Sequence, residues 1–343
     1  MKRLLNTLFV TRPDVYLALE GENVVIRQDH DTIARYPLHN LESIYTFGYI
    51  GASPALMGKC AERNITLTFM TQNGRFLARV IGESNGNVIL RKEQYRISDH
   101  EYRSALIARN FIVGKVFNNK WILERATRDH PLRLDVSKIK QVTESKAELL
   151  HAIRHVEDLE TLRGLEGSAA SKYYSVFDEL ILQQQEHFQF RGRSRRPPLD
   201  KVNALLSFTY SLLVQDVQAA LEGVGLDAYV GFLHRDRPGR PSLALDLMEE
   251  LRGVYVDRFV LSLINKKIVD HKGFHCKESG AVLMDDETRR KVLVAWQERK
   301  QEKIRHPFLN EQISWGLVPH AQALLLARYI RGDLDEYPPF LWK

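Results

Sequence analysis

The sequence predicts an α+β protein of two domains, a small N-terminal β-sheet domain followed by a larger all-α domain. Two observations predict this division: short apolar runs that alternate with polar residues fill about the first 85 residues, and apolar residues then recur at helical spacing. At 343 residues, with 44% hydrophobic side chains, the chain is long enough for each domain to bury a core.

The N-terminal domain, residues 1–85, is predicted to contain two β-hairpins with a short helix between them. The paired apolar runs are residues 15–19 with 24–26, and residues 65–70 with 75–81. The second hairpin has the stronger signal because Asn73-Gly74 favours the positive φ angles of a tight turn. Residues 54–62 form the predicted helix, and Pro54 suits its first turn. We therefore expect a small, mostly antiparallel sheet domain.

Glycine, serine and asparagine residues follow the second hairpin, and residues 86–92 are predicted to be a linker. Beyond the linker the apolar period becomes helical, and Gly or Pro residues separate several of the segments. The predicted helices are residues 93–127, 137–160, 160–188, 200–222, 243–268, 286–303 and 314–331. Residues 93–343 are therefore expected to form one all-α domain.

The charge of the chain favours a polyanionic partner. The formal net charge is +6, and residues 1–90 hold 9 Lys/Arg against 8 Asp/Glu, so most of the excess lies in the helical part. Three basic runs lie there: Arg191, Arg193, Arg195 and Arg196; Arg235, Arg237 and Arg240; and Arg299, Lys300, Lys303 and Arg305. One such run is usually only a solvated surface, but three in one domain favour contacts with a phosphate backbone.

Composition excludes several other classes of protein. Two cysteines are too few for a disulfide framework or a Cys-rich zinc site. The N-terminal apolar run ends by Arg12-Pro13, too early for a convincing secretion signal. No segment approaches the roughly 18 uninterrupted apolar residues of a membrane span. We therefore expect a cytoplasmic protein with no membrane partner.

The segment 231–252 holds candidate metal ligands. Asp246 and Glu249 stand three residues apart on a predicted helix, so their carboxylates project from one face. Together with His234, they make a mixed nitrogen and oxygen set that suits Mn²⁺ or Mg²⁺ better than zinc. The alternative is structural: His234 is a loop histidine hydrogen-bonded to backbone, and the carboxylates pair with nearby arginines or a helix N-terminus.

Glu166 is a further candidate because burying its carboxylate would cost free energy unless a cation or hydrogen bonds compensated the charge. On a helix it shares a face with Ala170, Tyr173 and Phe177, and a carboxylate on an apolar stripe needs compensation. A metal ion shared with His234 and Glu249 would explain the placement. A structural ion pair with an arginine would explain it equally well.

These segments together resemble a known family. Residues 165–174 (LEGSAASKYY), 202–213, 231–234 and 245–252 resemble the CRISPR-associated integrases of spacer acquisition, the Cas1 family. The basic insertion at 191–196 and the chain length resemble its subtype I-C branch most. The resemblance covers essentially the whole chain, since that family joins an N-terminal β domain, used for dimerisation, to a helical metal-dependent catalytic domain.

The resemblance implies the roles of particular residues. It places the family's metal-binding glutamate on Glu166, its histidine on His234 and its final acidic ligand on Glu249, with Mn²⁺ or Mg²⁺ as the cofactor. Asp246 matches a nearby acidic position among the catalytic residues, so either Asp246 or Glu249 is the direct third ligand. Candidate DNA-binding residues are Arg193, Arg195, Arg235, Arg240 and Arg252.

The resemblance also implies an activity. Family members form homodimers that assemble with a dimer of a small CRISPR-associated companion of nuclease fold, Cas2. They join the 3′-hydroxyls of a prespacer DNA duplex to the repeat of a CRISPR array, and the reverse reaction acts on branched DNA. Water in place of the hydroxyl gives endonuclease activity. Two alternatives remain: a non-catalytic DNA-binding scaffold of the same fold, and a metal-dependent hydrolase of a small phosphorylated metabolite.

Overall fold

A computed structural model describes residues 6–29, 31–72, 74–82 and 88–343. The chain divides into two compact units. The first comprises Met1–Asn85 and Met284–Glu302, and the second comprises Gly86–Leu283 and Lys303–Lys343. The division near residue 85 lies where the sequence predicts it.

The segment Met284–Glu302 departs from the expected division. Its helical periodicity places it in the predicted domain 93–343, but helix α9 (Asp286–Gln301) groups with the first unit. The side-chain amide of Gln72 donates a hydrogen bond to Asp286 over 3.1 Å, which ties the start of the helix to that unit. Periodicity shows which face of a helix is apolar, but it does not show which unit receives that face.

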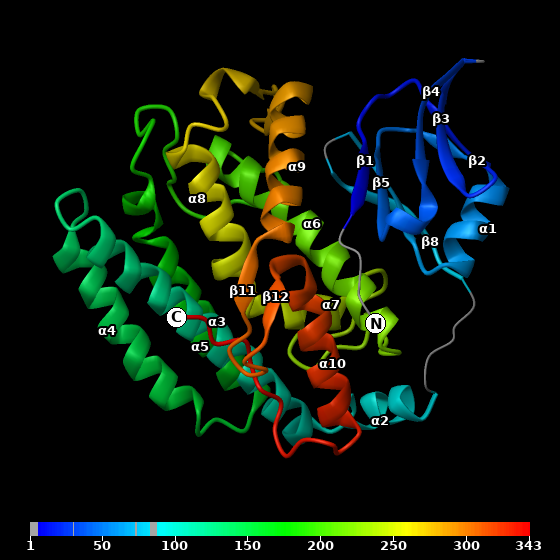
Figure 1. The fold of residues 1–343 in the computed structure, drawn as a ribbon. Helices are drawn as coiled ribbons and strands as arrows, with labels where there is room; N and C mark the ends of the chain where they lie inside the picture. The colour runs from blue at the N-terminus through cyan, green and yellow to red at the C-terminus, as the bar shows by residue number, and fades with distance from the viewer. Residues whose placement is uncertain (1–5, 30, 73, 83–87) are drawn as a thin grey trace. The chain divides into compact units, whose positions relative to one another are not determined.

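Two four-stranded sheets and helix α1 (Pro54–Glu62) form the rest of the first unit (Figure 1). One sheet has the order β1 (Thr7–Val10), β5 (Ser43–Phe47), β7 (Thr66–Met70), β8 (Phe76–Val80). The other has the order β4 (Asp31–Pro37), β3 (Asn23–Gln28), β2 (Tyr16–Glu20), β6 (Gly51–Ala52). Leu17, Val24, Ile44 and Leu67 are fully buried in the shared core.

Both predicted hairpins and the predicted helix are confirmed. Strand β2 pairs with β3, and β7 with β8, in antiparallel register; Asn73 of the predicted turn lies outside the described residues. The Ser53 side chain caps α1 by accepting a hydrogen bond from the Leu56 amide over 3.2 Å. The expectation of a mostly antiparallel sheet is confirmed only in part: among the described strands β2–β3, β3–β4 and β7–β8 pair antiparallel, whereas β1–β5, β5–β7 and β2–β6 pair in parallel. The connection from β5 to β7 runs through β6 and α1, which is long enough for a parallel crossover.

Helices dominate the second unit (Figure 1). They are α2 (Val88–Ser98), α3 (Glu101–Asp129), α4 (Val136–Ile153), α5 (Leu159–Tyr174), α6 (Lys201–Gly223), α7 (Ser242–Glu249), α8 (Arg258–Asn265) and α10 (Val318–Ile330). A π-helical segment, Arg252–Asp257, leads from α7 into α8, and 3₁₀ turns occur at Phe177–Leu180, His271–Gly273 and Trp315–Leu317. None of the helices in the described part of the chain is long and apolar enough to cross a membrane.

Three expectations for this unit need correction. It is not all-α, because β9 (Phe274–Cys276) pairs with β10 (Val282–Met284) and β11 (Lys303–Arg305) pairs with β12 (Gln312–Ser314). The predicted linker 86–92 is too long, since α2 already begins at Val88. The predicted helix 93–127 is broken before α3, where the His100 side chain caps the new helix by accepting from the Arg103 amide.

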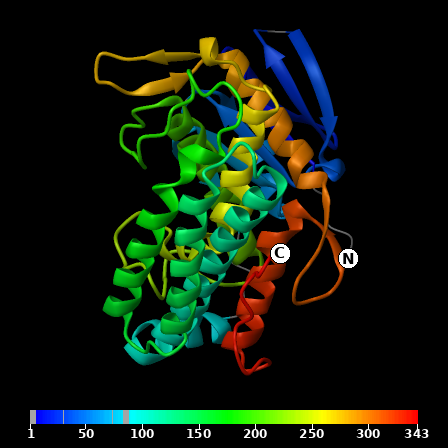
Figure 2. The ribbon, with the colours of Figure 1, turned by 90° about the vertical axis from the view of Figure 1, so that its left-hand side faces the viewer.

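Helices α3, α4 and α5 pack side by side, as both views show (Figures 1 and 2). Ala105, Ala108, Ile112 and Val116 form the buried stripe of α3 in this cluster. The small side chains of the two alanines let the neighbouring helices approach the N-terminal part of α3 closely. Lys115 directly precedes Val116, the last residue of this stripe.

Residues 336–342, the C-terminal strap, attach the end of α7 to α3. The carboxylate of Glu250 accepts from the Phe340 amide over 2.8 Å, and the Asn118 side chain donates to the carbonyls of Glu250 and Phe340 at 2.7 Å each. A side chain at Gly114 would not fit, because its Cβ would lie 2.7 Å from that of Glu250. These contacts hold the residues beside Glu250 close to α3.

Candidate metal centre

Glu166 and Glu249 come together around one buried ammonium group. The Lys115 Nζ, on α3, binds Oε1 of Glu166 on α5 and lies 2.6 Å from Oε2 of Glu249 on α7. Lys115 is 6% exposed and Glu249 is 4% exposed, while the Glu166 side chain is 27% exposed. Two carboxylates from separate helices therefore face a single cation position that is open to solvent on the Glu166 side.

Arg252 supplies a second positive charge to this cluster. Its Nη2 lies 3.0 Å from the other carboxylate oxygen of Glu249, Oε1, and its guanidinium stacks over the Tyr210 ring at 5.2 Å. Burial alone would raise the pKa of Glu249, but Arg252 and Lys115 outweigh burial and hold that pKa well below its ordinary value. Burial would lower the pKa of Lys115, but Glu249 and Glu166 outweigh burial and raise it. The charged forms of Glu249 and Lys115 therefore stabilise each other.

Asp246 organises the loop that carries His234. It is fully buried, and its Oδ2 accepts hydrogen bonds from the amides of Phe232 at 2.6 Å and Leu233 at 2.9 Å. Its Oδ1 accepts from the His234 amide at 3.0 Å and lies 2.5 Å from the imidazole Nδ1. Gly231 is required here, since a Cβ would lie 2.8 Å from Asp246 Oδ2. Both oxygens of Asp246 are thus engaged inside the protein.

The hydrogen bond to Asp246 also determines how His234 is presented. With Nδ1–H donating to the carboxylate, the lone pair of Nε2 is left available, the arrangement found when a carboxylate orients a metal-binding histidine. Arg163 on α5 donates two hydrogen bonds to the Leu233 carbonyl, at 3.0 and 2.8 Å. This contact brings the loop against the helix that carries Glu166.

The donor set fits a hard divalent cation. Two carboxylates converge on one position, and an imidazole oriented by a third carboxylate is carried by the loop that Arg163 binds to α5. Among the described residues no three His, Cys, Asp or Glu side chains are gathered in a ready metal-binding arrangement. The Lys115 ammonium holds the two carboxylates in the present arrangement.

The four predicted site residues therefore separate into two kinds. Glu166 and Glu249 face the cation position directly, whereas His234 and Asp246 bind each other. Sequence reasoning missed Lys115 and Arg163. A signal for Lys115 existed, since it interrupts the apolar residues of α3 between Ile112 and Val116, where an unpaired lysine would be costly.

The five candidate DNA-binding arginines also differ in their surroundings. Arg252 and Arg193 make internal contacts: Arg193 donates to Asn203 at 2.6 Å and to Ser207 at 3.1 Å, and lies over the Tyr210 ring. Arg195 is exposed, Arg240 is partly exposed, and Arg235 is 72% exposed while paired with Glu160 at 2.5 Å. Only these three present a guanidinium to solvent in the way a phosphate contact requires.

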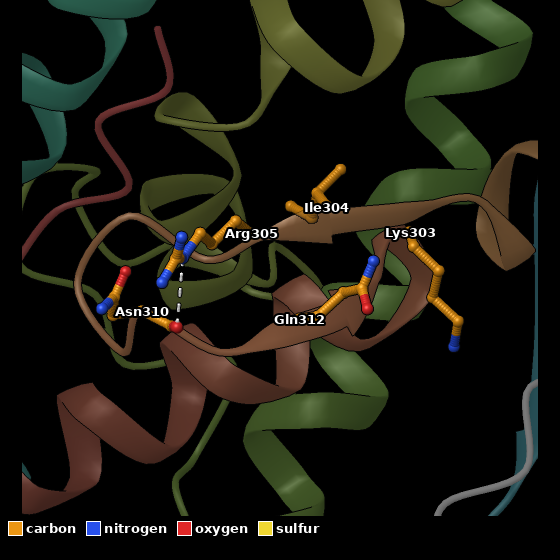
Figure 3. Close-up of a pocket in the computed structure, with 5 residues that line it drawn as sticks. All are labelled: Lys303, Ile304, Arg305, Asn310 and Gln312. Atoms are coloured by element: carbon orange, nitrogen blue, oxygen red, sulfur yellow. Dashed lines mark hydrogen bonds between the residues drawn. The ribbon is translucent and has the colours of Figure 1, made fainter.

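The third basic run contributes to a separate cavity on the β11–β12 hairpin. This cavity of about 360 Å³ is lined by Lys303, Ile304, Arg305, Asn310 and Gln312 (Figure 3). Arg305 Nε donates to the Asn310 carbonyl over 3.3 Å, which links the end of β11 to the turn that connects the two strands. None of the four candidate catalytic residues lines it.

Lys146 on α4 is fully buried against α5, and we expect its replacement by methionine to stabilise the protein. Its Nζ donates to the Ala169 carbonyl at 2.9 Å, and burial, with Lys115 and Lys172 nearby, lowers its pKa from 10.5 to about 7. The folded state therefore binds this proton less tightly than the unfolded state, so stability should rise between about pH 7 and pH 10. Lys146→Met should add about 2–4 kcal/mol to the free energy of unfolding at pH 7 and flatten this rise.

Denaturant unfolding at pH 7 and pH 9.5 measures both effects. Lys172→Met is the matched control, since Lys172 is exposed and should change stability by less than about 0.5 kcal/mol. A Lys146→Met variant that is less stable than the parent at pH 7 would contradict the assignment.

Comparison with known proteins places this chain in a family. A model of the family described as CRISPR associated protein Cas1 matches residues 8–298. The chain is 50% identical over 343 residues to CRISPR-associated endonuclease Cas1 1 of Chlorobaculum tepidum, and the alignment covers 100% of both chains. Both matches extend across the β-rich unit and the helical unit.

Solved structures share the fold at lower identity. A casposase bound to an integration product has a TM-score of 0.84 at 22% identity, covering 98% of this chain and 94% of that one. A chain of a Cas6-RT-Cas1–Cas2 complex has a TM-score of 0.82 at 21% identity, covering 98% of this chain and 36% of that one. These likenesses establish the mixed α+β fold, with a β-rich N-terminal part and a mainly helical C-terminal part.

Proposed function

The chain belongs to the Cas1 family of CRISPR-associated endonucleases, and on that premise we propose that it is the metal-dependent DNA endonuclease and integrase of CRISPR adaptation. The observation that carries this proposal is the convergence of Glu166 and Glu249 on one cation position beside a carboxylate-oriented imidazole. The sequence identity to a named endonuclease argues against the alternative of a non-catalytic scaffold.

The proposed reaction is a transesterification. The 3′-hydroxyl oxygen of a prespacer strand forms a bond to a phosphorus of the CRISPR repeat, and the bond from that phosphorus to the 3′-oxygen of the repeat strand breaks. The departing oxygen takes up a proton and becomes a new 3′-hydroxyl. Water in place of the attacking hydroxyl gives phosphodiester hydrolysis, and the reverse of strand joining resolves a branched DNA.

We assign Glu166, His234 and Glu249 as the ligands of a Mn²⁺ or Mg²⁺ ion. Asp246 is left out because both of its oxygens accept backbone or imidazole hydrogen bonds, so we give it the role of positioning His234. When bound, the ion would stabilise the charge that develops on the phosphate and on the leaving oxygen.

The arginines have two different proposed roles. Arg252 keeps Glu249 ionised. We assign the exposed or partly exposed Arg195, Arg235 and Arg240 to phosphate contacts.

The proposed partners are double-stranded DNA, as prespacer and repeat, a second copy of the chain and a Cas2 dimer. The fold shared with a chain of a Cas1–Cas2 complex supports the Cas2 partner, and the fold shared with a DNA-bound casposase supports the DNA partner. We propose that the first unit mediates homodimerisation and that the protein acts in the cytoplasm on the chromosomal array. The basic segment 191–196 and the chain length support membership of subtype I-C.

Removal of the metal tests the proposed function. Purified protein incubated with a labelled branched DNA should release the resolved strand in Mn²⁺, and EDTA should reduce that rate by at least about 10³-fold, because the carboxylates alone offer no charge stabilisation. Excess Mn²⁺ should restore it. DNA binding, followed in the same samples by fluorescence anisotropy, should survive chelation. Product formation that continues at an undiminished rate after exhaustive chelation would refute the proposal.

A further inference from the structure

The most unusual group in the centre is the Lys115 ammonium. It binds Oε1 of Glu166 and Oε2 of Glu249, and these carboxylates belong to the residues that the proposed function assigns to the metal. Arg252 uses the remaining oxygen of Glu249, Oε1, at 3.0 Å. Each cation therefore binds one oxygen of the Glu249 carboxylate, and of the two only Lys115 also binds Glu166.

From this arrangement we propose that Lys115 is a built-in counter-cation that holds the metal position in the metal-free protein and competes with the divalent ion for it. The inference rests on the proposed function, because it concerns the same site. Lys115 and Arg252 carry two positive charges against the two of Glu166 and Glu249, so the pair of carboxylates is compensated before any metal arrives. A divalent ion that takes both carboxylates must displace the ammonium.

The physical need for such a group follows from burial. Glu249 is 4% exposed, and two ionised carboxylates brought this close without a cation would repel each other and lose hydration. An ammonium on a flexible four-carbon stem can fill the position and then withdraw, whereas a rigid fork such as a guanidinium would be harder to displace. Withdrawal of the ammonium requires only side-chain rotation, because Asn118 and Gly114 attach the α3 backbone around Lys115 to the C-terminal strap and Glu250.

Divalent-ion affinity in the absence of DNA tests this inference. Lys115→Met removes the competing charge with little change in length, and Mn²⁺ titration followed by the electron paramagnetic resonance of the free ion should show a Kd at least about tenfold lower than that of the parent. Lys115→Arg keeps the charge and should not tighten binding. Lys120→Met, on the same helix but paired with Glu124, is the matched control and should leave the Kd unchanged. An unchanged or higher Kd for Lys115→Met would overturn the inference.

A second measurement uses the unaltered protein and does not depend on the folding of a variant. Acylation of lysines, quantified by mass spectrometry, should modify Lys115 slowly in EDTA and several-fold faster at saturating Mn²⁺, because the ion releases the ammonium from its carboxylates. Lys146, buried against the Ala169 carbonyl in both states, is the internal reference. Equal protection of Lys115 with and without bound Mn²⁺ would overturn the inference.

Glu166→Gln separates failure of this inference from failure of the proposed function. If the parent binds Mn²⁺ and Glu166→Gln loses that binding, the metal site stands, and the Lys115 results decide the inference alone. If neither the parent nor Lys115→Met binds Mn²⁺, the metal assignment itself fails and the inference falls with it.

Discussion

Replacing His234 with alanine should reduce strand transfer by at least about 10³-fold while DNA affinity stays within about threefold of the parent. The imidazole is oriented by Asp246 at 2.5 Å with its Nε2 available, so its removal deletes one ligand of the proposed ion and leaves the basic surface untouched. The rate is measured on a labelled branched DNA in saturating Mn²⁺, and affinity by anisotropy on the same DNA.

The control for this prediction is His275→Ala. His275 is exposed on β9 and lies outside the candidate centre, so its replacement should leave the strand-transfer rate within about twofold of the parent. Thermal unfolding should show that His234→Ala remains folded, because its side chain lies at the edge of the centre. Strand transfer by His234→Ala at a rate near that of the parent would show that His234 is not needed for the reaction.

Replacing Asp246 with asparagine should damage both stability and activity. Each Asp246 oxygen accepts two hydrogen bonds, and an amide nitrogen in place of either oxygen would face two donors instead. Leaving buried amide donors unsatisfied should cost about 3–5 kcal/mol of unfolding free energy. Loss of imidazole orientation should lower the strand-transfer rate about 10–100-fold at temperatures where the variant is folded.

Denaturant unfolding and the branched-DNA assay measure these two effects separately. Asp135→Asn is the control, since Asp135 caps α4 at an exposed position and asparagine caps nearly as well, so a change below about 0.5 kcal/mol is expected. Asp246→Asn with the stability of the parent would show that the loop does not depend on this carboxylate. Comparison with His234→Ala distinguishes the two proposed roles: Asp246 positions the imidazole, and His234 binds the metal ion.

The sequence by itself determined many of the local elements and supplied the candidate residues of the centre. Its Asn-Gly turn and Ser-Pro helix start predict β7–β8 and α1, and the periodicity predicts α6 and α9 within two residues at each end. It also singled out Glu166, His234, Asp246 and Glu249 from motif resemblance. Such features are local, because turn chemistry, capping and apolar period act over a few residues.

Only the tertiary structure decided which of these residues meet. The spacing of Asp246 and Glu249 on one helix left either as the third ligand, and the buried hydrogen bonds of Asp246 are what favour Glu249. Lys115, Arg163 and the grouping of α9 with the first unit depend on contacts between distant segments. Periodicity specifies the face of an element but not its partner, so these long-range choices are set by the packing of the whole chain.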